Sequence, residues 1–283
     1  LGEKGVLALM SDSTNVEVKG YTASEQDVAK NIEKLIAAAN GRVIVALFAS
    51  NVFRIQTVID IAVRSHRKVI FNGRSMEQIV SVATELGHIN CPPNTILDIK
   101  QIGKYRDDQI VVITTGSQGE PMSALVRMAS GIHKHIKIKK GDSVILSSKD
   151  IPGNEKAISG VINKLYRRGA DVVYSKIAQI HTSGHAHREE LKLMLNLTKP
   201  EYFIPIHGEY RHLVVHARLV EKMGMPRENV IVAEDGKIIA FDKDGGRLDG
   251  RVHTGRILVD GKGIGDVGRS VLKERRELSE GGL

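Results

Sequence analysis

The sequence predicts an α/β fold in which helices cover a parallel sheet. Seven short runs rich in Val, Ile and Leu alternate along the chain with amphipathic stretches of helical length. Several runs are apolar throughout, which is typical of strands buried on both faces of a parallel sheet. Regular alternation of strands and helices indicates an α/β architecture. The predicted strands are Val6–Met10, Arg42–Phe48, Lys68–Phe71, Gln109–Thr114, Ser143–Ser147, Asp171–Tyr174 and Tyr202–Ile206.

Helices are expected between these strands. The first has Ser24 as its N-cap, with Asp27 three residues further on, and Asn40-Gly41 ends it. Apolar residues recur between these signals at helical spacing. From Asp242 onward the chain is rich in Gly, Asp, Arg and Lys, and residues 269–283 are expected to form a linker or the start of another domain. The other predicted helices are Arg54–Arg64, Ser75–Leu86, Pro121–Gly131, Glu155–Arg168, Arg188–Leu197 and Tyr210–Met223.

Composition limits the class of protein. The 283 residues include 41 Lys and Arg against 33 Asp and Glu, a net charge of +8 that favours a polyanionic partner. The single cysteine, Cys91, excludes a disulfide scaffold and favours a reducing, cytoplasmic location. No apolar stretch approaches the roughly 20 residues of a membrane span, so no membrane insertion is expected. Aromatic residues are too few for a base-stacking platform, so phosphates would provide most contacts to a nucleic acid.

Polar loops rich in small residues follow many of the predicted strands. Ligands of open α/β sheets bind beyond the carboxyl ends of the strands, where these loops would converge. Gly and Ser allow backbone N–H groups to approach phosphate oxygens. No loop matches a P-loop, and none carries a dinucleotide-binding glycine fingerprint in its strand–helix context. The loops are residues 10–15, 48–51, 71–75, 114–120, 147–154, 181–187 and 205–209.

The histidines differ in their surroundings. Four of them gather in Gly- and Ser-rich turns, where a neutral imidazole could bind zinc or act as an acid or base. Their spacing alone does not make them metal ligands. His133 and His135 belong to a basic segment and are expected on a solvated face, whereas the remaining five are expected to be structural or at the surface. The four candidates are His181, His185, His187 and His207.

Over essentially its whole length, the sequence resembles the ribonuclease J family of the metallo-β-lactamase superfamily, β-CASP group. Several of the matching strings are long enough to be specific to this family rather than to the wider superfamily. The segments that carry the resemblance are Leu9–Asn15, Phe48–Arg54, Gly73–Met76, Thr115–Met122, Ile151–Asn154, His181–His185, Pro205–Arg211 and Val259–Gly268.

The resemblance implies a partial metallo-β-lactamase αββα sandwich into which a β-CASP domain is inserted. The implied boundaries place residues 1–22 and 177–258 in the metallo-β-lactamase domain and residues 23–176 in the β-CASP domain. Residues 259–283 would be a linker towards a missing C-terminal domain.

The activity implied by the resemblance is that of a ribonuclease that uses two zinc ions. Such enzymes act as 5′-to-3′ exonucleases and sometimes as endonucleases, in rRNA processing and mRNA decay in the cytoplasm. The implied substrate is single-stranded RNA with a 5′-monophosphate. The implied assembly is a homo-oligomer or a hetero-oligomer with a paralogue.

The resemblance also assigns site residues. Asp12 matches the acidic ligand that bridges the two metals, and His207 matches a late histidine ligand of one metal. His185 matches the β-CASP histidine that contacts the scissile phosphate, where an imidazole could protonate the leaving oxygen. Two metals about 3.5–4 Å apart can stabilise both oxygens of an in-line displacement at phosphorus. The turn that resembles the 5′-monophosphate pocket contains Ser183, Gly184, His185 and Ala186.

Three departures from the family pattern shape the expectations for this chain. The HxHxDH zinc motif is absent, as are the ligand histidine expected before Asp12 and the acidic residue expected in the loop near Arg54. The sequence therefore reads as a fragment that retains two metal ligands and is inactive alone. The main alternative is a non-catalytic RNA-binding or scaffold paralogue of ribonuclease J. A small-molecule hydrolase of the same superfamily is less favoured, because the phosphate-binding loops suit a polymer.

Overall fold

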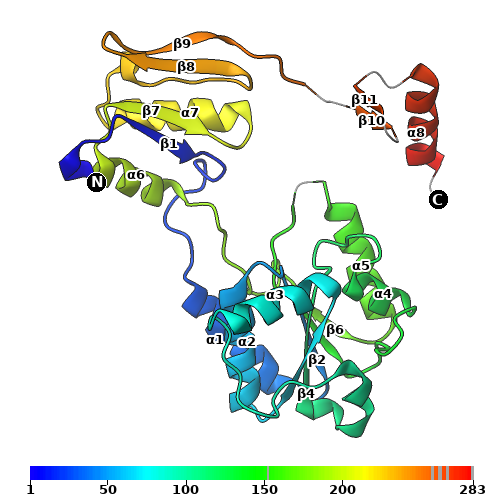
Figure 1. Cartoon of the computed structure of the whole chain (residues 1–283). Coiled ribbons are helices and arrows are strands. Elements are labelled where there is room, and N and C mark those ends of the chain that lie inside the picture. Colours follow the sequence, from blue (N-terminus) through cyan, green and yellow to red (C-terminus); the bar gives the residue numbers. More distant parts are fainter. Residues whose placement is uncertain (152, 256–257, 261–262, 266–267, 282–283) are drawn as a thin grey trace. The chain divides into compact units, whose positions relative to one another are not determined.

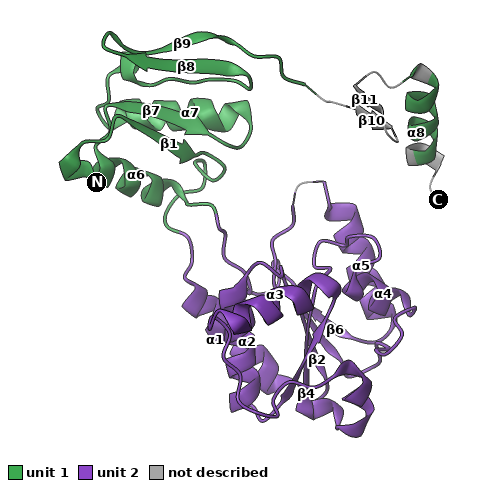
Figure 2. Ribbon diagram, in the orientation of Figure 1, with its two compact units in different colours: residues 1–21, 185–283 green, residues 22–184 purple. Residues whose placement is uncertain are grey.

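The chain folds as two units, one of which interrupts the sequence of the other (Figure 2). Unit 1 comprises Leu1–Tyr21 and His185–Leu283, and unit 2 comprises Thr22–Gly184. The domain boundaries expected from the family resemblance, at residues 22, 176 and 258, stay predictions. The computed structural model describes residues 1–151, 153–255, 258–260, 263–265 and 268–281.

Unit 2 is built on a five-stranded parallel sheet with the strand order β3-β4-β2-β5-β6 (Figure 1). All residues of β2 and β4, two neighbouring strands inside the sheet, are buried, which explains their unbroken apolar sequences. The predicted parallel sheet is therefore confirmed. Its strands are β2 (Val43–Ala46), β3 (Lys68–Asn72), β4 (Ile110–Thr114), β5 (Ser143–Leu146) and β6 (Asp171–Val173).

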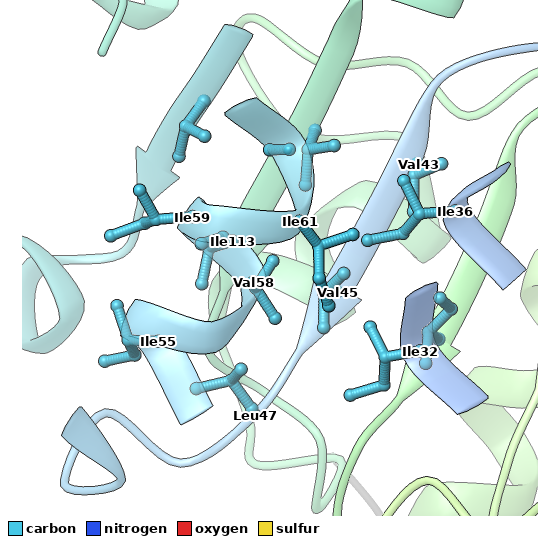
Figure 3. Packing of buried hydrophobic residues seen from close by; sticks show 14 of the residues in the cluster. Ile32, Ile36, Val43, Val45, Leu47, Ile55, Val58, Ile59, Ile61 and Ile113 are labelled. Carbon is cyan, nitrogen blue, oxygen red and sulfur yellow. The ribbon is translucent and has the colours of Figure 1, made fainter. Parts of the chain in front are cut away.

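Helices cover both faces of this sheet. On β2, Val43 and Val45 belong to one buried cluster with residues of α1, α2 and α3, and Figure 3 labels its members from α1 and α2, whereas Ile44 and Ala46 belong to the cluster with α4 and α5. The Ser24 side chain accepts a hydrogen bond from the Asp27 N–H and caps α1, as its sequence predicts. The helices are α1 (Glu25–Ala38), α2 (Val52–Arg64), α3 (Arg74–Glu85), α4 (Ala124–Ser130) and α5 (Glu155–Arg167), with short 3-10 helices at Ile99–Lys104 and Asp107–Gln109.

Unit 1 joins the two ends of its interrupted sequence in one parallel strand pair. Strand β1 (Ala8–Asp12) pairs with β7 (Tyr202–Ile206), and Asp12 lies opposite Ile206. Phe203 of β7 packs with residues of α6 and α7 in a small buried cluster. The remaining elements before residue 252 are α6 (Arg188–Thr198), α7 (Tyr210–Lys222), 3-10 helices at Gly2–Lys4 and Arg227–Asn229, and the hairpin of β8 (Lys237–Asp242) and β9 (Gly245–Arg251).

The end of the chain contains a helix that the sequence did not predict. Arg269–Gly281 forms helix α8, and the expectation that residues 269–283 are a linker or the start of another domain stays a prediction. Its Leu, Lys, Glu and Arg residues all have high helix propensity, and Lys273 pairs with Glu277 one turn later at 3.7 Å. Before it, β10 (Leu258–Asp260) pairs with β11 (Gly263–Gly265). Of the motifs that carry the resemblance, Pro152, Gly261, Lys262, Asp266 and Val267 lie outside the described residues.

Elsewhere the predicted elements are confirmed, with bounds that differ by at most three residues, but the β8–β9 hairpin was not predicted. Within the described parts of the chain, no helix is both long and apolar enough to cross a membrane.

The prediction of a solvated face for His133 is wrong. This side chain is buried, and its Nδ1 accepts hydrogen bonds from the N–H groups of His135 and Ile136, at 3.3 and 3.0 Å. Its Nε2 lies 3.1 Å from the Asn72 amide. The basic neighbours misled the prediction, because the lysines of this segment are exposed whereas His133, Ile136 and Ile138 are buried and His135 is half-buried.

Burial of neutral histidines predicts a pH-dependent stability. Burial, as the largest cause, lowers the pKa values of His133, His181 and His216 from an ordinary value of 6.5 to about 4. Between these values the unfolded chain binds protons that the folded chain does not. We therefore expect the contribution of these histidines to the free energy of unfolding to be complete above about pH 6.5 and to be lost as the pH drops towards 4.

Urea unfolding midpoints at pH 7.5 and 5 would measure this loss. His133→Asn should reduce the difference between the two midpoints, whereas replacing the exposed His88 by Asn should leave it unchanged. Equal midpoints at both pH values in the unmodified protein would contradict the prediction.

Candidate metal site

Three of the predicted site residues meet in unit 1. Asp12, His185 and His207 each offer one ligand atom, and these atoms lie within 4.8 Å of one another. Strand register explains the first contact: Asp12 ends β1 opposite Ile206, and His207 is the next residue after β7. His185 stands at the start of the chain segment that leads into α6. The sequence therefore brings together residues that are far apart in the chain through one parallel strand pair.

The Asp12 carboxylate is at the centre of this cluster. Its Oδ2 lies 2.9 Å from Nδ1 of His185 and 3.3 Å from Nδ1 of His207. Its Oδ1 accepts a 2.9 Å hydrogen bond from the N–H of Thr14, whose hydroxyl lies 2.8 Å from the same His207 nitrogen. The two imidazole rings stack at 5.2 Å between their centres. Burial raises the pKa of Asp12, but hydrogen bonds from Thr14 and His185 outweigh burial, and the net pKa is lowered.

Backbone strain accompanies the histidine after β7. His207 has φ of +63°, in the left-handed region that residues other than Gly rarely adopt, and Gly208 follows with φ of +86°. A Cβ at Gly208 would lie 2.8 Å from Nδ1 of His212, so this position also requires glycine for space. That nitrogen accepts the Glu209 N–H at 2.9 Å at the start of α7. Left-handed residues other than Gly cluster at functional sites, which fits the position of His207 in this group.

A buried layer supports the loop after β1. The Ser13 hydroxyl lies 3.0 Å from Nδ1 of His216, a buried residue of α7 whose ring contacts Phe203 edge-on. Asn15 donates a 2.8 Å hydrogen bond to the main-chain oxygen of His185 and so connects the loop after β1 to the segment that begins at His185. The sequence pattern marked the loop after β1 as polar but did not identify Asn15 or His216, because their partners lie about 170 and 200 residues away.

The residues of the predicted phosphate turn divide between the two units. Ser183 and Gly184 are the last residues of unit 2, whereas His185 and Ala186 begin the second segment of unit 1. Their predicted contact with a 5′-monophosphate stays a prediction. His187, the next residue, is the N-cap of α6, and its N–H donates to the Glu190 carboxylate at 2.8 Å. His181 belongs to unit 2 and is not one of the three residues of the metal cluster.

The donor set of the cluster fits zinc. Zinc in proteins takes imidazole nitrogen and carboxylate oxygen, and a catalytic zinc commonly has three protein ligands and one open position. Asp12, His185 and His207 supply one oxygen and two nitrogens within reach of one ion. A pair of ions would need more ligands than these three residues provide.

Comparisons with known proteins first define the class. Residues 40–165 match the family model described as the ribonuclease J beta-CASP domain, and these residues lie within unit 2. Residues 170–233 match the RNA specificity domain of Zn-dependent metallo-hydrolases. The fold is therefore that of the β-CASP group of the metallo-β-lactamase superfamily.

Comparison with curated relatives narrows the class to one family. The chain is 44% identical to ribonuclease J 1 of Streptococcus pyogenes serotype M3 and 41% identical to ribonuclease J2 of Bacillus subtilis, each over 283 residues. It is 44% identical to ribonuclease J of Synechocystis over 282 residues. The chain belongs to the ribonuclease J family. All of this chain is matched in each comparison, and it spans 50%, 51% and 44% of these relatives, respectively, or about half their length.

Proposed function

We propose that this protein is a zinc-dependent ribonuclease that degrades single-stranded RNA from a 5′-monophosphate end and sometimes cleaves internally. The observation that carries the proposal is the convergence of Asp12, His185 and His207 within 4.8 Å at the ends of β1 and β7. The Zn-dependent RNA specificity domain that overlaps two of these residues supports the same chemistry. The comparisons do not favour the alternative of a non-catalytic RNA-binding scaffold.

The roles proposed for the three residues follow from their contacts. His207 is the proposed metal ligand, and His185 is proposed to contact the scissile phosphate and to protonate the leaving oxygen. When bound, zinc would supply a Lewis acid for the phosphate. Asp12 is the proposed acidic ligand and bridging group, and its Oδ2 also faces Nδ1 of both histidines. A carboxylate in that position fixes the orientation of the rings and leaves a lone pair for a metal at Nε2 of His207.

The two roles of Asp12 can be separated by Asp12→Asn. If Asp12 bridges two ions, the variant should lose zinc, measured by mass spectrometry of the metal content. If Asp12 chiefly orients the imidazoles, the variant should keep zinc while kcat falls about 10–100-fold, the usual effect of removing such a partner. Full activity with full zinc content would contradict both roles.

Several further properties are proposed from the family and the sequence. Ser183, Gly184, His185 and Ala186 are proposed to bind RNA phosphate, with main-chain N–H groups of this turn holding the 5′-monophosphate. Two zinc ions, a homo-oligomer or hetero-oligomer with a paralogue, and action in rRNA processing and mRNA decay are proposed by family membership. A cytoplasmic location is proposed because the only cysteine, Cys91, is unpaired.

The direct test uses the full-length gene product and RNA labelled at its 3′ end. We expect progressive shortening of 5′-monophosphorylated RNA, loss of cleavage after a chelator removes zinc, and recovery when zinc is restored. Absence of any cleavage by the zinc-loaded protein would contradict the proposal.

Phosphate contacts predict that RNA binding depends on salt. With a net charge of +8 and few aromatic residues, the protein is expected to bind RNA mainly through phosphates. Two or more phosphate contacts would weaken binding of a single strand at least about sevenfold when salt rises fourfold. Filter binding of single-stranded RNA at the two salt concentrations would measure the change, and an unchanged affinity would contradict the prediction.

A further inference from the structure

An arginine is buried in a polar cluster of unit 2. Arg54 lies in the first turn of α2, and its side chain is 2% exposed. Its Nε and Nη2 donate to the two carboxylate oxygens of Glu25 at 3.2 and 2.5 Å. Its Nη1 donates to the main-chain oxygen of Ser147 at 3.1 Å and lies 2.9 Å from Nδ1 of His181. We call Arg54, Glu25, Ser147 and His181 the Arg54 cluster.

Packing alone does not account for this arginine. Burying a guanidinium is costly unless its N–H groups have partners, and an apolar residue of similar volume often serves stability as well. The planar guanidinium, however, presents donors in several fixed directions. In the Arg54 cluster it reaches three separate segments: the start of α1 at Glu25, the residue after β5 at Ser147, and the segment around His181.

Those segments include the places where the chain leaves unit 2. The chain passes between the units at Tyr21–Thr22 and at Gly184–His185. Close to both points, the Thr182 hydroxyl donates a 2.6 Å hydrogen bond to the main-chain oxygen of Ala23. The Ser147 hydroxyl donates at 2.6 Å to the oxygen of Ile180, next to His181. The Arg54 cluster therefore holds the residues that immediately precede the proposed phosphate turn.

We propose that Arg54 is a positioning residue for the turn of Ser183, Gly184 and His185. By joining Glu25, Ser147 and His181, its guanidinium fixes the segment from which this turn begins. The inference rests on the proposed function for its catalytic consequence, since that turn is proposed to hold the 5′-phosphate. Arg54 itself touches none of the proposed reacting groups.

The state of His181 supports this role. An arginine can only donate, so Nδ1 of His181 must be an acceptor. Burial, followed by the charge of Arg54, lowers the pKa of His181 to about 4. The ring therefore stays neutral near pH 7, and the hydrogen bond is maintained.

Arg54→Lys tests the inference, because lysine keeps the charge but cannot span three segments. Arg67→Lys is the matched control: Arg67 is also buried in unit 2, but it donates only to main-chain oxygens of Ile36, Ala39 and Gly41. In the full-length gene product, two quantities would be measured. These are amide hydrogen exchange over residues 179–186 and the ratio of kcat/KM for 5′-monophosphorylated RNA to that for 5′-hydroxyl RNA.

We expect Arg54→Lys to speed exchange over residues 179–186 and to lower the substrate ratio about tenfold, since small displacements of positioning groups are costly. Arg67→Lys should change neither. Unchanged exchange and an unchanged ratio in Arg54→Lys would overturn the inference. A wild-type protein that does not cleave RNA would instead overturn the proposed function, and exchange alone would then decide the role of Arg54.

A second variant covers the case in which Arg54→Lys does not fold. His181→Phe removes the imidazole that accepts from Arg54, and it should speed exchange over the same residues. His181→Gln, whose side-chain oxygen can accept from the guanidinium, should restore slow exchange. Slow exchange in His181→Phe would overturn the inference.

Discussion

His207→Ala is expected to lower kcat/KM for RNA cleavage by more than about 100-fold, because changes one shell beyond a metal ligand already cost 10–100-fold. The variant removes one of the two imidazoles of the cluster and leaves alanine at the left-handed position after β7. Alanine should also relieve little of the backbone strain, so the loss would come from the missing ring. Zinc content and cleavage of 5′-monophosphorylated RNA by the full-length gene product would measure the effect.

The control for this prediction is His253→Ala. His253 is exposed, follows β9 in the same unit and belongs to no metal cluster among the described residues. It should keep zinc and activity. If His207→Ala retained both at the level of His253→Ala, the assignment of His207 as a metal ligand would be wrong.

Asp142→Ala is expected to lower the free energy of unfolding of unit 2 by about 3–5 kcal/mol, the usual cost of breaking a buried ion pair. Asp142 and Arg42 are 1% and 6% exposed, and their charged groups meet at 2.6 Å. They precede β5 and β2, whose first residues pair in the sheet. The Asp142 carboxylate also accepts the Lys139 N–H at 3.0 Å. The variant leaves a buried guanidinium without its counter-ion.

Two comparisons test whether burial of the ion pair causes the large loss of stability expected for Asp142→Ala. Glu33→Ala breaks the exposed Arg64–Glu33 pair, whose side chains are 57% and 45% exposed, and should cost less than about 1 kcal/mol. The double variant Arg42→Met with Asp142→Leu should recover much of the loss, because it removes both charges. Chemical unfolding would measure all three variants. Equal losses for Asp142→Ala and Glu33→Ala would contradict the prediction.

The sequence predicts unit 2 well because its signals are local. Unbroken apolar runs such as Val43–Ala46 and Ile110–Thr114 mark strands that neighbours cover on both faces. Capping at Ser24 fixes the start of a helix from three adjacent residues. The β8–β9 hairpin was missed because its residues are mostly exposed and Gly-rich, and α8 was missed because its charged residues resemble a linker.

The candidate site could be predicted only in part. The family motifs brought Asp12, His185 and His207 to attention, and the structure places all three together. Their supporting partners could not be predicted, since the pairing of Asn15 with His185 depends on folding across the whole of unit 2. His133 was misjudged for a related reason: its environment includes Asn72 at the end of β3, which is distant in the sequence, and is not set by its basic neighbours alone.

The insertion of unit 2 also bears on the order in which the protein acquires its structure. Ala8 and Tyr202 are strand partners, yet every residue of unit 2 is synthesised between them. Closing so long a loop of disordered chain carries an entropic cost. Once unit 2 has folded, the hydrogen bond from Thr182 to Ala23 holds its two ends together, and the effective loop becomes short. We therefore expect the strand pair that carries Asp12 to form last, as a late event that depends on the maturation of the inserted unit.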